Sequence, residues 1–176
     1  MARMMDMAVF YPLPQAGIGL VAADFLPNEV KCGMNLLTLD QENRAEIAQW
    51  LADDNWVVAC LCAAWCDTCG TYRSKFAELA SMHPEQRFVW IDIEDQAEFV
   101  GDLDIDNFPT LLMQRSDVVS FFGTTLPDLN LADRLLRAQL DKSPQELERE
   151  ASSNDEHKSW QQDCNLRARL TACERN

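Results

Sequence analysis

The sequence lacks any long hydrophobic run: none approaches the roughly 18 to 20 apolar residues that a membrane-spanning helix needs. Basic residues are scarce, with 15 Lys and Arg against 29 Asp and Glu and a formal net charge of −14. Such a surface repels phosphate backbones and anionic lipids, so we expect neither a nucleic-acid partner nor a membrane partner. The chain also lacks internal repeats and low-complexity tracts, and its 176 residues fit one ordinary domain with extensions.

An even, regularly spaced set of cysteines is missing as well, which argues against a secreted disulfide scaffold. A reducing cytoplasm is the simpler setting, and we expect a cytoplasmic protein. A secretory signal ending near residues 21–23 is the alternative, but Pro12, Pro14 and Gln15 interrupt the apolar stretch that it would need. The seven cysteines are Cys32, Cys60, Cys62, Cys66, Cys69, Cys164 and Cys173.

The order of hydrophobic patterns predicts an α/β fold. Residues 1–33 are interrupted by prolines and glycines, residues 34–142 alternate strand-like and helix-like patterns, and residues 143–176 are polar. Alternation of this kind predicts a mixed central sheet with helices on both faces. We therefore expect an N-terminal extension at 1–33, one domain at 34–142 and a C-terminal helical tail at 143–176. Strands are expected at 36–39, 56–62, 88–93, 111–113 and 118–122.

The tail begins with a clear helix signal. Ser143-Pro144-Gln145-Glu146 is a capping box with proline at the first helical position. Trp160, Leu166 and Leu170 suggest a second amphipathic helix. Because the helix at 128–142 is expected to complete the covering of the sheet, we expect the tail to be dispensable for the core. A frayed extension and a docked helix both stay open.

Two cysteines, Cys66 and Cys69, follow the apolar strand 56–62, directly behind Trp65. The carboxyl end of a buried strand is a preferred place for sites in α/β sheets. At the start of the next helix, unpaired N–H groups and the positive helix end favour a thiolate at Cys66. Cys69 lies one turn further on, within reach of a disulfide with Cys66. The arrangement suits thiol–disulfide exchange, in which Cys66 attacks and Cys69 resolves.

Two other interpretations of these cysteines remain. Cys60 and Cys62 would supply the second pair of ligands that a structural zinc site needs, but their place in a buried strand disfavours it, and we expect no metal. On their own, Cys60 and Cys62 are expected to be small buried hydrophobes. The alternative is a regulatory second disulfide. Two cysteines two residues apart on a strand are poorly placed to form a disulfide with each other, so Cys60 or Cys62 would have to bond to Cys66 or Cys69.

Three features in register make residues 34–142 resemble the thioredoxin family: Ala63-Ala64-Trp65-Cys66-Asp67-Thr68-Cys69, Phe108-Pro109-Thr110, and Gly123 after the hairpin. The resemblance implies a protein disulfide oxidoreductase of cell redox homeostasis that needs no bound cofactor. It also implies a cis bond before Pro109 and a groove, shaped by Trp65, Phe108 and Pro109, for extended substrate backbone. The implied partners are disulfide-containing proteins and a separate thioredoxin-reductase-like electron donor.

The chain departs from the family pattern at three places. Asp67 and Thr68 stand between the cysteines, and a carboxylate beside Cys66 opposes its ionisation. Cys60 occupies the position of the family's buried acid, and Cys62 that of an aromatic residue. These departures leave an alternative from another class: an interaction or assembly module that keeps the fold but has little catalytic turnover.

Overall fold

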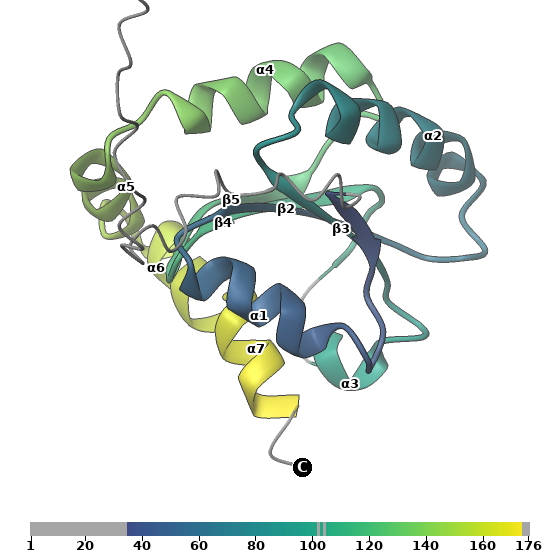
Figure 1. Ribbon diagram of the computed structural model, residues 1–176, viewed down its shortest axis with the longest axis horizontal. Helices are drawn as coiled ribbons and strands as arrows, with labels where there is room; N and C mark the ends of the chain where they lie inside the picture. Colours follow the sequence, from purple (N-terminus) through teal and green to yellow (C-terminus); the bar gives the residue numbers. More distant parts are fainter. Residues whose placement is uncertain (1–34, 102, 104, 174–176) are drawn as a thin grey trace, which may run out of the picture. The chain divides into compact units, whose positions relative to one another are not determined.

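The computed structural model describes residues 35–101, 103 and 105–173, so the expected extension at 1–33 lies outside the described residues. These residues build a five-stranded sheet with the strand order β1-β3-β2-β4-β5 (Figure 1). Neighbouring strands are parallel among β1, β3 and β2, whereas β4 runs antiparallel to both β2 and β5. The predicted mixed sheet is confirmed. Its strands are β1 (Leu36–Thr38), β2 (Trp56–Cys62), β3 (Arg87–Asp92), β4 (Thr110–Arg115) and β5 (Val118–Thr124).

Strand β2 occupies the centre of the sheet because every one of its side chains is apolar. All its residues are buried, and it pairs with β3 on one side and β4 on the other. Its side chains alternate between the two faces. Val58, Cys60 and Cys62 belong to the core layer on one face, while the residues between them belong to the layer on the other.

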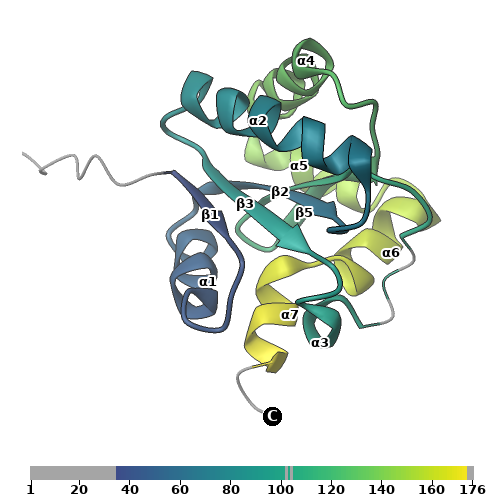
Figure 2. The ribbon, with the colours of Figure 1, turned by 90° about the vertical axis from the view of Figure 1, so that its right-hand side faces the viewer.

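Helices cover both faces of the sheet (Figures 1 and 2). The first face, called the α2 face here, carries α2 (Asp67–Met82) and α4 (Leu129–Leu140). The opposite α1 face carries α1 (Arg44–Ala52), α3 (Ala97–Val100) and α7 (Leu166–Cys173). Among the described residues, the helices are too short or too polar to cross a lipid bilayer.

The polar C-terminal region is helical, as predicted, and it is packed. It forms α5 (Pro144–Ala151), α6 (Asp155–Asp163) and α7, and the capping box at Ser143 is present. Leu166 and Leu170 are only 2% and 0% exposed, because α7 lies against α1 and completes the α1 face. The described part of the chain therefore shows no frayed tail, and all of it belongs to one compact unit. The division at residue 142 stays a prediction.

A buried glutamine attaches the tail to the sheet. The side-chain amide of Gln114, in β4, donates to the Ser116 carbonyl at 2.8 Å and to Asn165 Oδ1 at 3.0 Å. Its oxygen accepts from the backbone N–H of Leu166 at 2.8 Å. Gln114 is fully buried, so these bonds replace the water that its amide would otherwise keep.

A second glutamine covers the outer edge of the sheet. The amide of Gln161, in α6, accepts from the backbone N–H of Val119 and donates to the Val119 carbonyl, both at 2.8 Å. Val119 lies in β5, an edge strand of the sheet, and its outward N–H and C=O groups face no other strand among the described residues. The side chain thus pairs with this edge as another strand would.

Candidate redox site

The site lies where β2 ends and α2 begins. Cys66 is the N-cap residue of α2, with extended backbone angles and no hydrogen bond from its side chain to the first turn. Its N–H donates to the Ala63 carbonyl at 3.0 Å, and its carbonyl accepts from Gly70 at 3.1 Å. The half-buried, free thiol of Cys66 therefore sits at the positive end of the helix, as the sequence predicts.

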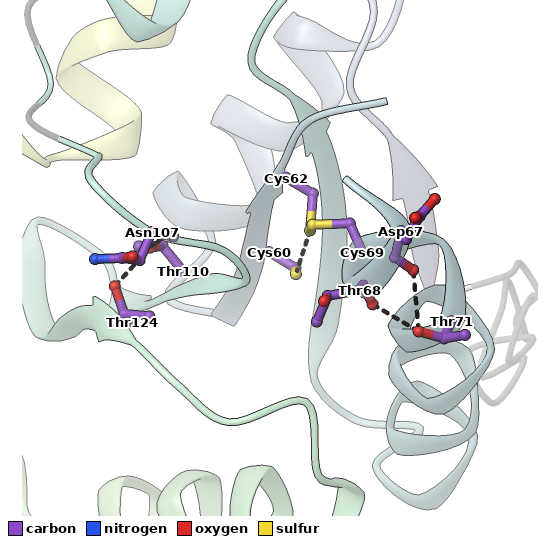
Figure 3. The surroundings of a disulfide bond; sticks show 9 residues. All are labelled: Cys60, Cys62, Asp67, Thr68, Cys69, Thr71, Asn107, Thr110 and Thr124. Atoms are coloured by element: carbon purple, nitrogen blue, oxygen red, sulfur yellow. Dashed lines mark hydrogen bonds between the residues drawn. A yellow bond between two sulfur atoms is a disulfide. The ribbon is translucent and has the colours of Figure 1, made fainter. Parts of the chain in front are cut away.

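The disulfide of the structure joins Cys62 to Cys69 (Figure 3). The sequence instead predicts a pair of Cys69 with Cys66. Cys69 lies on the buried side of α2, and Cys62 ends β2 on the same face of the sheet. Their Cα atoms are 5.9 Å apart, an ordinary separation for a disulfide. The interpretation of Cys62 as a plain buried hydrophobe is therefore wrong, and the alternative of a second disulfide that reaches Cys69 is what the structure shows.

Cys60 continues this line of sulfur atoms into the core. Its Sγ is 3.9 Å from that of Cys62, on the same face of β2 (Figure 3). Burial raises the pKa of the Cys60 thiol far above the usual range, so it stays neutral at physiological pH. Cys60 fits the expected role of a small buried hydrophobe. Within the described residues, no group of three or more His, Cys, Asp or Glu side chains could hold a metal ion.

Tyr72 of α2 places a buried hydroxyl beside these sulfurs. Its side chain is only 1% exposed, and its hydroxyl has no hydrogen-bond partner in the described structure. Burial, and then the neighbouring Cys60 and Asp128, raise the pKa of this phenol. An unpaired buried hydroxyl of this kind destabilises a folded protein by about 1–3 kcal/mol.

Tyr72→Phe is therefore expected to stabilise the protein by about 1 kcal/mol, because it removes the unpaired hydroxyl and keeps the ring. Urea unfolding followed by circular dichroism measures the change. Phe76→Tyr is the reciprocal control, since it places a new hydroxyl on the same buried face of α2, and it should lower stability. A loss of stability in Tyr72→Phe would show that the hydroxyl is paired after all.

The loop before β4 provides the second half of the site. The Phe108–Pro109 peptide bond is cis, which confirms the prediction. The Pro109 carbonyl accepts from Thr125 N–H at 3.0 Å, and Thr110 Oγ1 donates to the Asn107 carbonyl at 2.7 Å. The Phe108 ring meets the ring of Trp65 edge-on, with 5.7 Å between ring centres. The structure thus brings this loop to the residue that precedes Cys66.

Trp65 is the most accessible side chain of this group, with 66% of its surface exposed. Phe108 is half-buried and Pro109 is buried. The exposed indole of Trp65 directly precedes Cys66 in the chain. The role of Trp65, Phe108 and Pro109 in binding substrate stays a prediction.

A hollow of about 280 Å³ adjoins the cis-proline loop. Asn107 and Thr110 line it on one side, and Glu156 and Trp160 of α6 line it on the other. No local pattern in the sequence predicts this wall, because Trp160 is remote in the chain from the cis-proline loop. The pairing of Cys62 with Cys69 is one of the alternatives that the sequence leaves open, and the spacing of the cysteines does not select it.

Comparisons with known proteins agree with this architecture. The family model described as Thioredoxin matches residues 36–135, a span that holds Cys66, Cys69 and Pro109. Thioredoxin H4-2 of Oryza sativa subsp. japonica is 26% identical over 98 residues, which cover 54% of this chain and 74% of the relative.

A poplar thioredoxin h has a TM-score of 0.55 at 21% identity, covering 62% of this chain and 99% of that one. This chain is also similar in fold to thioredoxin f2 in the crystal structure of its complex with ferredoxin:thioredoxin reductase. That structure has a TM-score of 0.52 at 17% identity and covers 60% and 96% of the two chains. These similarities show the fold that the sequence pattern predicts.

Proposed function

Because the chain belongs to the thioredoxin family, whose members exchange thiols and disulfides, we propose that it reduces the disulfides of protein substrates. In this proposal Cys66 is the attacking thiol and Cys69 the resolving thiol. The observation that carries it is the free, half-buried thiol of Cys66 at the start of α2. Cys69 is one turn further along the same helix.

The reaction needs two exchange steps. The Cys66 thiolate attacks one sulfur of the substrate disulfide, so that a mixed disulfide forms and one substrate thiolate leaves. The Cys69 thiolate then attacks Cys66 Sγ, which releases the second substrate thiolate and forms a Cys66–Cys69 disulfide. The two electrons that reduce the substrate come from the two cysteines.

Cys69 is bonded to Cys62 in the structure, so this disulfide has to be reduced before Cys69 can resolve. The proposed donor is a separate reductase, and a thioredoxin f2 similar in fold crystallised with a reductase of this kind supports that class of partner. Trp65, Phe108 and Pro109 are the proposed substrate-binding residues. We propose the cytoplasm, in keeping with a reductive role in redox homeostasis, as the compartment.

The test is catalytic reduction of insulin by dithiothreitol, with the full-length protein. Cys66→Ser should lower the rate to that of dithiothreitol alone, because a serine hydroxyl does not attack a disulfide at neutral pH. Cys164→Ala is the matched control, since Cys164 is a buried cysteine on the α1 face, and its rate should stay at the wild-type value. Full activity in Cys66→Ser would overturn the proposal, and a folded wild type without turnover would favour the interaction module.

A further inference from the structure

We propose that Cys62 is a second resolving cysteine. After each turnover it displaces Cys66 from the Cys66–Cys69 disulfide and becomes bonded to Cys69. The oxidised protein then holds the Cys62–Cys69 disulfide and a free thiol at Cys66. The inference rests on the proposed function, because it needs exchange at Cys66 and Cys69.

The geometry places Cys69 between two cysteines. Cys66 precedes it by one helical turn. Cys62 approaches it from the end of β2 (Figure 3). Cys62 and Cys69 belong to one core layer and are each only 1% exposed. Cys66 is the cysteine at the surface of this group and stays unbonded. The site therefore has one accessible thiol in front of a buried disulfide.

The additional step is an internal exchange. The Cys62 thiolate attacks Cys69 Sγ, the Cys69–Cys66 bond breaks, and its electron pair leaves on Cys66 Sγ. The proton that Cys62 gave up is taken by the Cys66 thiolate or by solvent. One disulfide is lost and one is formed, so the step needs no oxidant and no reductant.

The environment of the three sulfurs favours this direction. A thiolate at Cys62 would be buried among apolar side chains, where the charged form is disfavoured. A thiolate at Cys66 has partial access to water and the positive end of α2. The exchange therefore places the buried sulfur of Cys62 in a neutral disulfide and leaves the free sulfur at Cys66, at the start of α2.

This arrangement gives the oxidised protein a second reactivity. Its free Cys66 thiol can still attack a disulfide, but Cys69 is bonded to Cys62 and cannot resolve the product. The reduced protein thus exchanges through the two thiols of Cys66 and Cys69, whereas the oxidised protein exchanges through Cys66 alone. Attack of Cys66 on Cys69 reverses the exchange and returns the disulfide to the surface, where a reductase can reach it.

Disulfide mapping of the full chain tests the inference. Reduced protein, freed of reductant, is oxidised with one equivalent of diamide, alkylated under native conditions with N-ethylmaleimide and digested without reduction. Asp-N cleaves before Asp67, so Cys69 falls on a different peptide from Cys62 and Cys66. Fragmentation of the linked peptide pair in the mass spectrometer then shows which cysteine is bonded to Cys69 and which is alkylated.

Wild type should give a peptide of Cys62 joined to Cys69, with Cys66 alkylated. Cys62→Ala should instead join Cys66 to Cys69 and protect Cys66 from alkylation. Cys60→Ala is the matched control, because Cys60 is a buried cysteine on the same face of the same strand, and it should map like wild type. Cys62→Ser, checked for folding by circular dichroism, is a second variant at the position.

A wild type in which Cys66 is joined to Cys69 and protected overturns the role of Cys62. An alkylated Cys66 in both Cys62 variants also overturns it, because Cys66 would then never pair with Cys69. Both results leave the insulin assay to decide the proposed function separately. If Cys66→Ser reduces insulin normally, the proposed function fails whatever the mapping shows.

Discussion

Cys69→Ser is expected to accumulate as a covalent complex with its substrate, one substrate molecule per protein. Attack by Cys66 needs no other cysteine, so the mixed disulfide forms as in wild type. Its release needs a thiolate at position 69, and a serine hydroxyl does not supply one at neutral pH. The covalent species should rise from a transient intermediate to the main product.

Intact-mass spectrometry of the reduced variant, mixed with excess insulin, measures this complex. Cys66→Ser/Cys69→Ser is the matched control and should form none. Cys62→Ala/Cys69→Ser should trap as much as Cys69→Ser alone, because Cys62 is bonded to Cys69 in the structure and acts through it. Equal trapping without Cys66 would refute the assignment of the attacking thiol. Rapid release in Cys69→Ser that ends when Cys62 is also removed would show that Cys62 resolves Cys66 directly.

Removal of residues 143–176 is expected to destabilise the protein by at least about 4 kcal/mol. The deletion uncovers the apolar surfaces that Leu147, Leu166 and Leu170 cover, and each fully buried leucine contributes about 1.5–3 kcal/mol. It also removes the partners of Gln114 in the tail, which leaves a buried amide of β4 partly unpaired. Urea unfolding of the shortened chain should show a much lower midpoint or no cooperative transition.

A single substitution in the full chain separates packing from length. Leu170→Ala should lower the free energy of unfolding by about 2–5 kcal/mol, because the Leu170 side chain of α7 is completely buried in the core layer of the α1 face. Ala172→Ser, on the exposed side of the same helix, should leave the midpoint almost unchanged. A shortened chain with the wild-type midpoint would instead support the domain boundary expected at residue 142.

The sequence predicts those parts of the site that lie in continuous patterns. The apolar run 56–62 predicts the central strand, and its end predicts where Cys66 starts a helix. The motif around Pro109 predicts the cis bond through the resemblance to a family. In each case the signal lies within a few neighbouring residues, where local geometry controls the structure.

The pairing of Cys62 and the packing of the tail depend on contacts between distant segments. Whether Cys69 meets Cys66 or Cys62 depends on how α2 lies over the end of β2, and the spacing of cysteines does not contain that information. Leu166 and Leu170 are isolated apolar residues in a polar segment. Their burial is not visible in the local sequence, because the surfaces that bury them belong to α1 and the sheet. In the sequence Gln114 is an ordinary polar strand residue, and only the structure shows that its hydrogen-bond partner is Asn165 of the tail.

The pairing of Gln161 with Val119 also restricts how copies of this protein meet. Two sheets join into one when their border strands exchange main-chain hydrogen bonds, which is a common route to unwanted assembly. At Val119, near the start of β5, those bonds are already made within the same molecule. A second chain that approaches this border has to displace the Gln161 amide first, so α6 guards the fold against growth into a continuous sheet.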